Sequence, residues 1–266
     1  DDGGFTFDTE MYYNANASTF VAWCWKGGGA AVSNSDGSIT SSVSANQQAG
    51  FSIVSYTGTG SVATIGHGLG KKPDWIIVKN RTDSNNWNIY HSANGANYVS
   101  YFTTSARVDQ TSNWNDTEPT STVFTVGTSN GTNGSSDNMI AYCWSEIPGF
   151  SKFSKYSGNG NSNGPFIYLG FRPAWLLVRR IDSGDHWIIR DSARNIFNDT
   201  YFNLLPNSNN AETGSSGSVQ SIDFLSNGFK LRGTDSGVSS SSGTYIYMAF
   251  AEQPGTTPFD TFPNAR

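Results

Sequence analysis

The sequence repeats itself at a spacing of 100 residues, and this duplication constrains the fold more than any other feature. The segment Pro73-Asp-Trp-Ile-Ile-Val-Lys79 has its counterpart in Pro173-Ala-Trp-Leu-Leu-Val-Arg179. At the same spacing, Tyr56-Thr-Gly-Thr-Gly60 corresponds to Tyr156-Ser-Gly-Asn-Gly160. Solenoid repeats have periods of roughly 20–50 residues, so a period this long indicates a repeated domain. We therefore expect two small folding units, each with a core of its own.

The two copies also end alike. Ile140-Ala-Tyr-Cys-Trp-Ser-Glu-Ile-Pro-Gly149 corresponds to Ile246-Tyr-Met-Ala-Phe-Ala-Glu-Gln-Pro-Gly255, now at a spacing of 106 because of loop insertions. We place the first unit at residues 50–149 and the second, which carries a C-terminal tail, at residues 150–266.

The first 49 residues contain part of a third copy. Val21-Ala-Trp-Cys-Trp25 matches Ile140-Ala-Tyr-Cys-Trp144, and segments 5–13 and 19–25 are typical of two strands joined by a turn. We interpret residues 1–49 as a β-hairpin followed by a Gly/Ser-rich connector, the end of a preceding repeat. The sequence is accordingly expected to be a fragment of a longer protein.

Both units are predicted to be all-β. Each has about seven short apolar segments with turn residues between them, a pattern typical of antiparallel sandwiches. No segment keeps a 3.6-residue period. The block Trp75-Ile-Ile-Val78 is continuously apolar, which indicates a strand that is covered on both faces or bulged. We therefore expect two tandem antiparallel β-sandwich-like repeats of about 100 residues plus the N-terminal hairpin.

Charge and composition limit the partners of the chain. A net charge of −5 without any basic cluster argues against nucleic acid as the main partner. The apolar runs are too short for a transmembrane helix, so no membrane insertion is expected. Charged residues make up only 14% of the chain, and the abundance of Gly, Ser, Thr and Asn is common in secreted or virion β-proteins. For Cys24 and Cys143 a disulfide is open, but we favour free thiols that each point into a core.

The sequence offers little catalytic chemistry. No histidine position recurs in both units, and neither a metal-binding His spacing nor a nucleophile elbow is present. Asp116 and Glu118 remain an alternative carboxylate pair for glycoside hydrolysis, and the loop Asp182-Ser-Gly-Asp185 an alternative calcium site. Glu146 and Glu252 recur before a Pro-Gly and suit a structural task. We expect no catalytic residue, no metal and no cofactor.

Aromatic residues are the best remaining indication of function. Those within apolar segments are expected to form the structural core: Trp75, Trp175, Trp25, Trp144 and Phe250. Those in or beside polar loops, with one neighbouring carboxylate, are the candidate ligand-binding residues: Tyr98, Tyr101, Trp114, Asp116 and Tyr201. Aromatic faces flanked by polar groups suit sugar rings, although such residues can equally cover the ends of a sandwich.

The chain resembles a family of modules near the C-termini of marine bacteriophage tail-fibre-like and related virion proteins. The resemblance covers residues 20–255, and the motifs that carry it are Gly50-Phe-Ser-Ile-Val-Ser-Tyr-Thr-Gly58, Gly66-His-Gly-Leu-Gly-Lys-Lys-Pro-Asp-Trp-Ile-Ile-Val-Lys-Asn-Arg81, Ile140-Ala-Tyr-Cys-Trp144, Gly149-Phe-Ser-Lys-Phe153 and Tyr245-Ile-Tyr-Met-Ala-Phe-Ala-Glu252. In such proteins a lectin-like sandwich commonly precedes the segment that resembles Ala22-Trp-Cys-Trp-Lys-Gly-Gly28, so residues 1–49 can also be the end of one. The resemblance implies a role on the virion surface and names no catalytic residue.

We therefore expect a non-enzymatic bacteriophage virion surface protein, either a tail fibre or a receptor-binding adhesin module. Its expected partners are a host cell-surface glycan or protein and other virion proteins, and its expected location is the particle surface. A homotrimer is expected because fibre proteins gain avidity from several weak sites. The alternatives are a polysaccharide depolymerase of a tail spike and a structural or capsid-decoration spacer without receptor binding.

Overall fold

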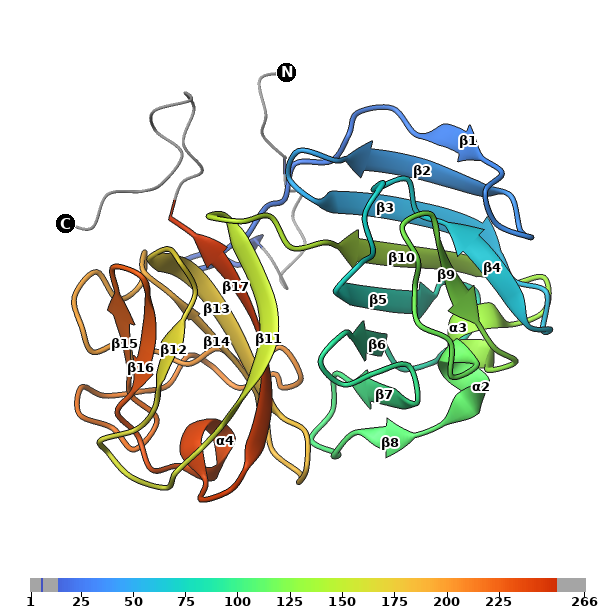
Figure 1. Cartoon of the computed structure of the whole chain (residues 1–266). Helices are drawn as coiled ribbons and strands as arrows, with labels where there is room; N and C mark the ends of the chain where they lie inside the picture. Colours follow the sequence, from blue (N-terminus) through green and yellow to red (C-terminus); the bar gives the residue numbers. More distant parts are fainter. Residues whose placement is uncertain (1–5, 7–13, 253–266) are drawn as a thin grey trace.

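The computed structural model describes residue 6 and residues 14–252, and within them the chain is almost entirely β (Figure 1). The strands form several antiparallel sheets, and the all-β prediction is confirmed. The named helices of this part of the chain are single turns of four residues: α2 (Thr111–Trp114), α3 (Asn130–Asn133) and α4 (Ser236–Ser239).

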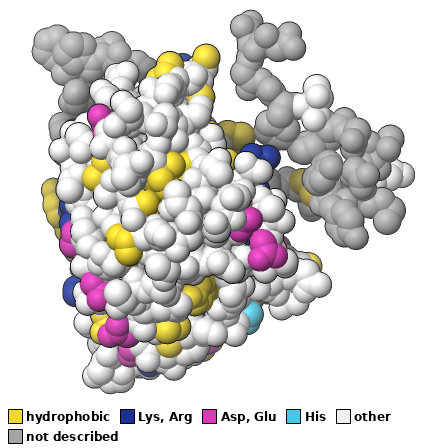
Figure 2. Space-filling view, turned by 90° about the vertical axis from the view of Figure 1, so that its right-hand side faces the viewer, with side chains coloured by type: hydrophobic (Ala, Val, Ile, Leu, Met, Phe, Trp, Pro, Cys, Tyr) yellow, Lys and Arg dark blue, Asp and Glu magenta, His cyan; other side chains and the backbone are white. Residues whose placement is uncertain are grey.

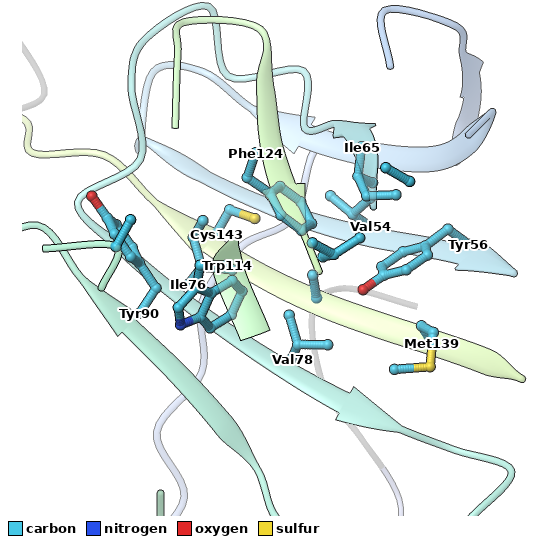
Figure 3. Packing of buried hydrophobic residues seen from close by; sticks show 14 of the residues in the cluster. Val54, Tyr56, Ile65, Ile76, Val78, Tyr90, Trp114, Phe124, Met139 and Cys143 are labelled. Atoms are coloured by element: carbon cyan, nitrogen blue, oxygen red, sulfur yellow. The ribbon is translucent and has the colours of Figure 1, made fainter. Parts of the chain in front are cut away.

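The first unit is built on an eight-stranded antiparallel sheet with the order β1-β2-β3-β10-β5-β6-β7-β8. In chain order these strands are β1 (Val32–Asn34), β2 (Ser41–Asn46), β3 (Phe51–Thr57), β5 (Trp75–Asn80), β6 (Asn88–His91), β7 (Tyr98–Tyr101), β8 (Val108–Asp109) and β10 (Asn138–Trp144). A two-stranded sheet of β4 (Ala63–Gly66) and β9 (Val123–Val126) faces it. The first core lies between the two sheets; Figure 3 shows Val54, Ile76 and Cys143 of the large sheet with Phe124 of the small one.

The second unit has a four-stranded sheet with the order β11-β17-β13-β14 and a three-stranded sheet with the order β12-β16-β15. Their bounds are β11 (Ser151–Ser157), β12 (Phe166–Tyr168), β13 (Pro173–Arg180), β14 (Trp187–Asp191), β15 (Ile222–Leu225), β16 (Gly228–Leu231) and β17 (Thr244–Ala251). The second core, which includes Leu176, Phe229 and Tyr247, lies between these sheets.

The central part of both large sheets has the same connectivity. The order β3-β10-β5-β6 in the first unit corresponds to β11-β17-β13-β14 in the second. Matching residues also make matching contacts: the Tyr56 hydroxyl donates to the Thr132 carbonyl at 2.6 Å, and the Tyr156 hydroxyl donates to the Val238 carbonyl at 2.8 Å. The first bond connects β3 to the single-turn helix α3, and the second connects β11 to the single-turn helix α4.

A third core joins the two units and explains why β5 and β13 are continuously apolar. Side chains alternate between the faces of a strand, so Ile76 and Val78 enter the first core while Trp75 and Ile77 point toward the second unit. Trp75 lies 6.4 Å from Phe153 and 5.9 Å from Trp187, measured between ring centroids. The sheet of the first unit is therefore buried on both faces where the second unit covers it.

Two of the tryptophans expected in the structural core, Trp75 and Trp175, pack in this shared core. Trp75 is fully buried and Trp175 is 8% exposed. Hydrogen bonds also join the two units: the Trp187 indole N–H donates to the Tyr101 carbonyl at 2.8 Å, and Arg179 donates to the Ser105 carbonyl.

The structure corrects the assignment of the N-terminal 49 residues. Residues 19–25 form no strand, and segment 5–13, apart from residue 6, lies outside the described residues. The segment expected to be a connector contains β1 and β2, which extend the sheet of the first unit beside β3. The Ser-rich alternation of β2 places Val43 in the first core while its serine neighbours Ser42 and Ser44 face outward.

Both cysteines are free, but only one lies in a core. Cys143 is buried, and burial raises the pKa of its thiol well above the usual value. Cys24 is exposed, contrary to our expectation, because its segment does not join a sheet and does not alternate between an inner and an outer face.

Replacing a tryptophan of the shared core should destabilise the whole protein. For Trp175→Ala we expect the free energy of unfolding in urea to fall by about 3–5 kcal/mol, the usual cost of deleting a large buried aromatic. Trp87→Ala is the matched control, because Trp87 is 39% exposed, and it should cost about 1 kcal/mol. Equal losses in the two variants would contradict the shared core.

The stability of the fold should fall in mild acid. Burial lowers the pKa of His67 and of His91 to about 4, from an ordinary value of about 6.5. The His91 ring accepts a hydrogen bond from the Ala93 N–H and donates one to the Tyr247 carbonyl, so it is neutral when folded.

Because the unfolded chain binds these protons more readily, the stability present above about pH 6.5 should decline as the pH falls to about 4. Urea unfolding of wild type and of His91→Asn between pH 4 and pH 7 checks this. The free energy of unfolding should depend less on pH in the variant than in wild type. An unchanged slope would show that His91 does not cause the loss of stability in acid.

Candidate functional site

One of the predicted ligand-binding residues belongs to the core. Trp114, expected in a solvent-facing loop, is 2% exposed and packs edge-on against Tyr90, with ring centroids 6.0 Å apart (Figure 3). Its polar sequence neighbours suggested an exposed loop. Instead, the single turn α2 points the indole inward, and Asn115, in the left-handed region, ends the helix. Trp114 therefore cannot meet a ligand at the surface.

Three other predicted residues each contact a neighbouring side chain of the first unit. Tyr98 is half-buried beneath the guanidinium of Arg107, which lies 4.0 Å from its ring centroid. The Tyr101 hydroxyl donates to the Gln110 side chain at 3.1 Å. Asp116 is exposed and accepts a hydrogen bond from Thr111.

The fifth of these residues lies in the second unit. Tyr201 packs on Phe202, with a centroid distance of 4.6 Å. Among the described contacts, none joins Tyr201 to the predicted residues of the first unit.

A different set of residues surrounds a cavity of about 340 Å³ on the first unit. We call it the aromatic groove, and its lining residues are Trp25, Phe51, Ile53, Tyr142 and Trp144. Four of them come from the neighbouring strands β3 and β10, where Tyr142 is paired with Ile53 and Trp144 with Phe51. All four point away from the first core because they occupy alternate positions in register.

The groove lies within a row of nearly parallel aromatic rings. Trp87 and Tyr142 have centroids 6.4 Å apart and an interplanar angle of 29°, and Tyr142 and Trp144 are related by 6.4 Å and 28°. Phe51 follows at 5.0 Å from Trp144 with an angle of 31°. Trp87 is part of the surface, so the row runs from an exposed ring to buried ones.

The fifth wall of the groove comes from residues Trp23–Gly29, which we call the strap. Trp25 meets Trp144 of the first unit edge-on at 6.0 Å, and it meets Trp175 and Phe250 of the second unit at 5.5 Å each.

The strap is anchored to both units. The Trp23 indole N–H donates to Asp191 at 3.3 Å, while Ser44 on β2 donates to the Gly29 carbonyl at 2.7 Å. One wall of the groove is therefore fixed by the packing between the units.

The residues that line the groove carry no charge. None of its five lining residues is ionisable except Tyr142, whose hydroxyl makes no hydrogen bond to another described residue. Ser55 lies two residues beyond Ile53 on the same face, opposite Ser42 of β2. Ser42 is exposed and Ser55 is half-buried, and neither hydroxyl makes a hydrogen bond within the described chain, so the two form a hydroxyl rim beside the aromatic floor.

The acidic residues singled out from the sequence serve structural contacts. Although burial alone would raise it, hydrogen bonds from Lys72, Tyr90 and the Ala96 N–H hold the pKa of Glu118 below its usual value. Asp182 accepts from Arg180 at 3.0 Å, and Asp185 accepts from Ser236 at 2.7 Å. The described residues contain no group of three or more His, Cys, Asp or Glu side chains placed to hold a metal ion.

The two recurring glutamates also have partners nearby. Burial raises the pKa of Glu146, which accepts a hydrogen bond from the Phe153 N–H, and Glu252 forms an ion pair of 3.3 Å with Arg172. These contacts suit the structural task expected for both positions.

None of the helices between residues 14 and 252 has the length and apolar character needed to cross a membrane. Comparisons with curated proteins and with solved structures gave no match. A family model does match residues 1–254, nearly the whole chain. The protein therefore belongs to the family described as DUF7483, a domain of unknown function.

Proposed function

We propose that the chain is a non-enzymatic part of a bacteriophage virion surface, a tail-fibre or adhesin module that attaches to a glycan or protein of the host surface. The observation that supports it best is the aromatic groove, a cavity lined by aromatic rings. It lies on the face of the first unit's large sheet that the second unit covers only in part. Sites of this kind recognise ligands without chemistry of their own. The virion setting is carried over from the sequence resemblance.

The surface of the protein supports weak, polar recognition. Figure 2 shows one face of the molecule that is mostly white, the colour of the backbone and of side chains that are neither charged nor hydrophobic, with acidic groups in a few small patches. A surface without a strong field of one sign neither attracts nor repels an uncharged partner at long range. Attachment would then depend on short-range contacts such as those the groove offers.

The depolymerase alternative has less support among the described residues. Glycoside hydrolysis requires two carboxyl groups on either side of the scissile bond. Of the acids proposed for it, Glu118 is engaged by Lys72 and Tyr90, and Asp116 by Thr111. A pure spacer, in turn, would not need an open aromatic groove, because exposed apolar surface lowers solubility unless it is used.

We further propose that the working form is a homotrimer, because several weak sites held together raise the effective concentration at each further contact. Light scattering should report three times the mass of one chain. A monomer at micromolar concentration would contradict this part of the proposal and leave the attachment function standing.

Fluorescently labelled protein should bind to a susceptible strain within a panel of marine bacteria. Tyr142→Ala removes the central ring of the groove and should reduce bound protein by about tenfold, the effect of losing a central aromatic contact. Tyr168→Ala is the matched control, because Tyr168 is an aromatic that is 61% exposed on the second unit, and it should bind as wild type does.

Absence of binding to every strain, together with release of reducing sugars from purified polysaccharide, would overturn the proposal in favour of the depolymerase. Equal loss of binding in Tyr142→Ala and Tyr168→Ala would instead show that the groove is not the contact site.

A further inference from the structure

We infer that the ligand of the aromatic groove is an uncharged glycan segment, held by stacking of a sugar face on Tyr142 and by hydrogen bonds to the hydroxyl rim. This inference rests on the proposed attachment function and deepens it by naming the ligand chemistry. It differs from the sugar-binding residues expected from the sequence, since none of those five residues lines this groove.

Ring geometry is the first reason. Pyranose rings expose C–H groups on their faces, and these pack on aromatic rings while the hydroxyls around the edge stay polar. Trp87, which is 39% exposed, and the half-buried Tyr142 offer neighbouring rings within 30° of parallel, so that one extended ligand can contact both.

Charge is the second reason. An acidic sugar or a phosphate requires a cation as partner, and no lysine or arginine lines the groove. Lys79 lies on the same face of the sheet, outside the lining, where it donates to the Asn85 carbonyl at 2.6 Å. An anion in the groove would therefore meet no cation among the lining residues, whereas a neutral sugar needs none.

The hydroxyl rim supplies what a neutral sugar needs. The hydroxyls of Ser42, Ser55 and Tyr142 make no hydrogen bond within the described chain; on the groove face Ser42 is exposed, and Ser55 and Tyr142 are half-buried. Each hydroxyl both donates and accepts, so the rim can pair with sugar hydroxyls in either sense.

Size argues against a folded protein as the occupant. A stable protein contact buries roughly 800 Å² on each partner, whereas this site is a cavity of about 340 Å³ with the strap as one of its walls. A cavity of this volume fits a small ligand or a short segment of a longer chain.

The test is a titration of the whole protein with neutral hexasaccharides of glucose, mannose and galactose, and with a hexauronate of equal length. Binding is followed by calorimetry and by tryptophan fluorescence, because Trp25 and Trp144 both line the groove. At least one neutral hexasaccharide should bind about tenfold or more tightly than the hexauronate, since the anion meets no cation among the lining residues.

Variants locate the site. Tyr142→Ala should weaken binding of the neutral ligand about tenfold or more, whereas Tyr142→Phe, which keeps the ring, should stay within about threefold of wild type. Trp87→Ala tests the outer end of the row at an exposed position that folding tolerates, and it should weaken binding by a smaller factor. Tyr168→Ala should have no effect, and circular dichroism and urea unfolding confirm that each variant is folded.

Tighter binding of the hexauronate, absence of binding by every neutral hexasaccharide, or equal affinity of wild type and Tyr142→Ala would overturn the inference. A cell-binding assay distinguishes failure of this inference from failure of the proposed function. Cell binding that a neutral hexasaccharide does not compete would leave attachment standing and reject the glycan. Neutral-glycan binding at the groove without cell attachment would reject attachment and keep the ligand assignment.

Discussion

Burial of both faces of one sheet is the constraint on which the rest of the structure depends. In β5 and β13 every residue of the apolar block is covered, and alternation divides them: Ile76 and Leu176 enter the core of their own unit, whereas Trp75 and Trp175 enter the shared core. A sheet with two apolar faces requires a cover on each. The small sheets supply one cover, and each unit supplies the other for its partner, so neither unit is complete alone.

The groove exists because the large sheet of the first unit is wider than that of the second. The first unit has eight strands in its large sheet and the second has four, because β1 and β2 extend the sheet beyond β3 and β7 and β8 extend it beyond β6. The second unit and the strap cover the face around Trp75, but Ile53 and Tyr142 lie nearer to the β2 side and are only partly buried at the groove. The open site is the part of the wider sheet that its partner does not cover.

The sequence predicted the repeat, the all-β class and the fully covered strand at Trp75, because these depend on spacing and alternation alone. It did not predict what lies on each face. Trp114 sits among polar residues yet points inward from a single helical turn, and Tyr142 sits in an apolar run yet faces the groove. Alternation tells which residues share a face, but the cover of that face comes from segments distant in the chain, such as the strap and β2.

Residue choice at equivalent positions agrees with this unequal cover. The positions of Tyr142 and Trp144 in β10 correspond to Met248 and Phe250 in β17, by the shared spacing of 106 and by the same pairing with β5 and β13. Met248 is 2% exposed, and a flexible apolar side chain suits a filled core. Tyr142 is half-buried, and it places an apolar ring on the sheet while its hydroxyl reaches solvent. The duplicated strand thus carries a core residue where its face is closed and an amphipathic ring where it is open, as a binding surface requires.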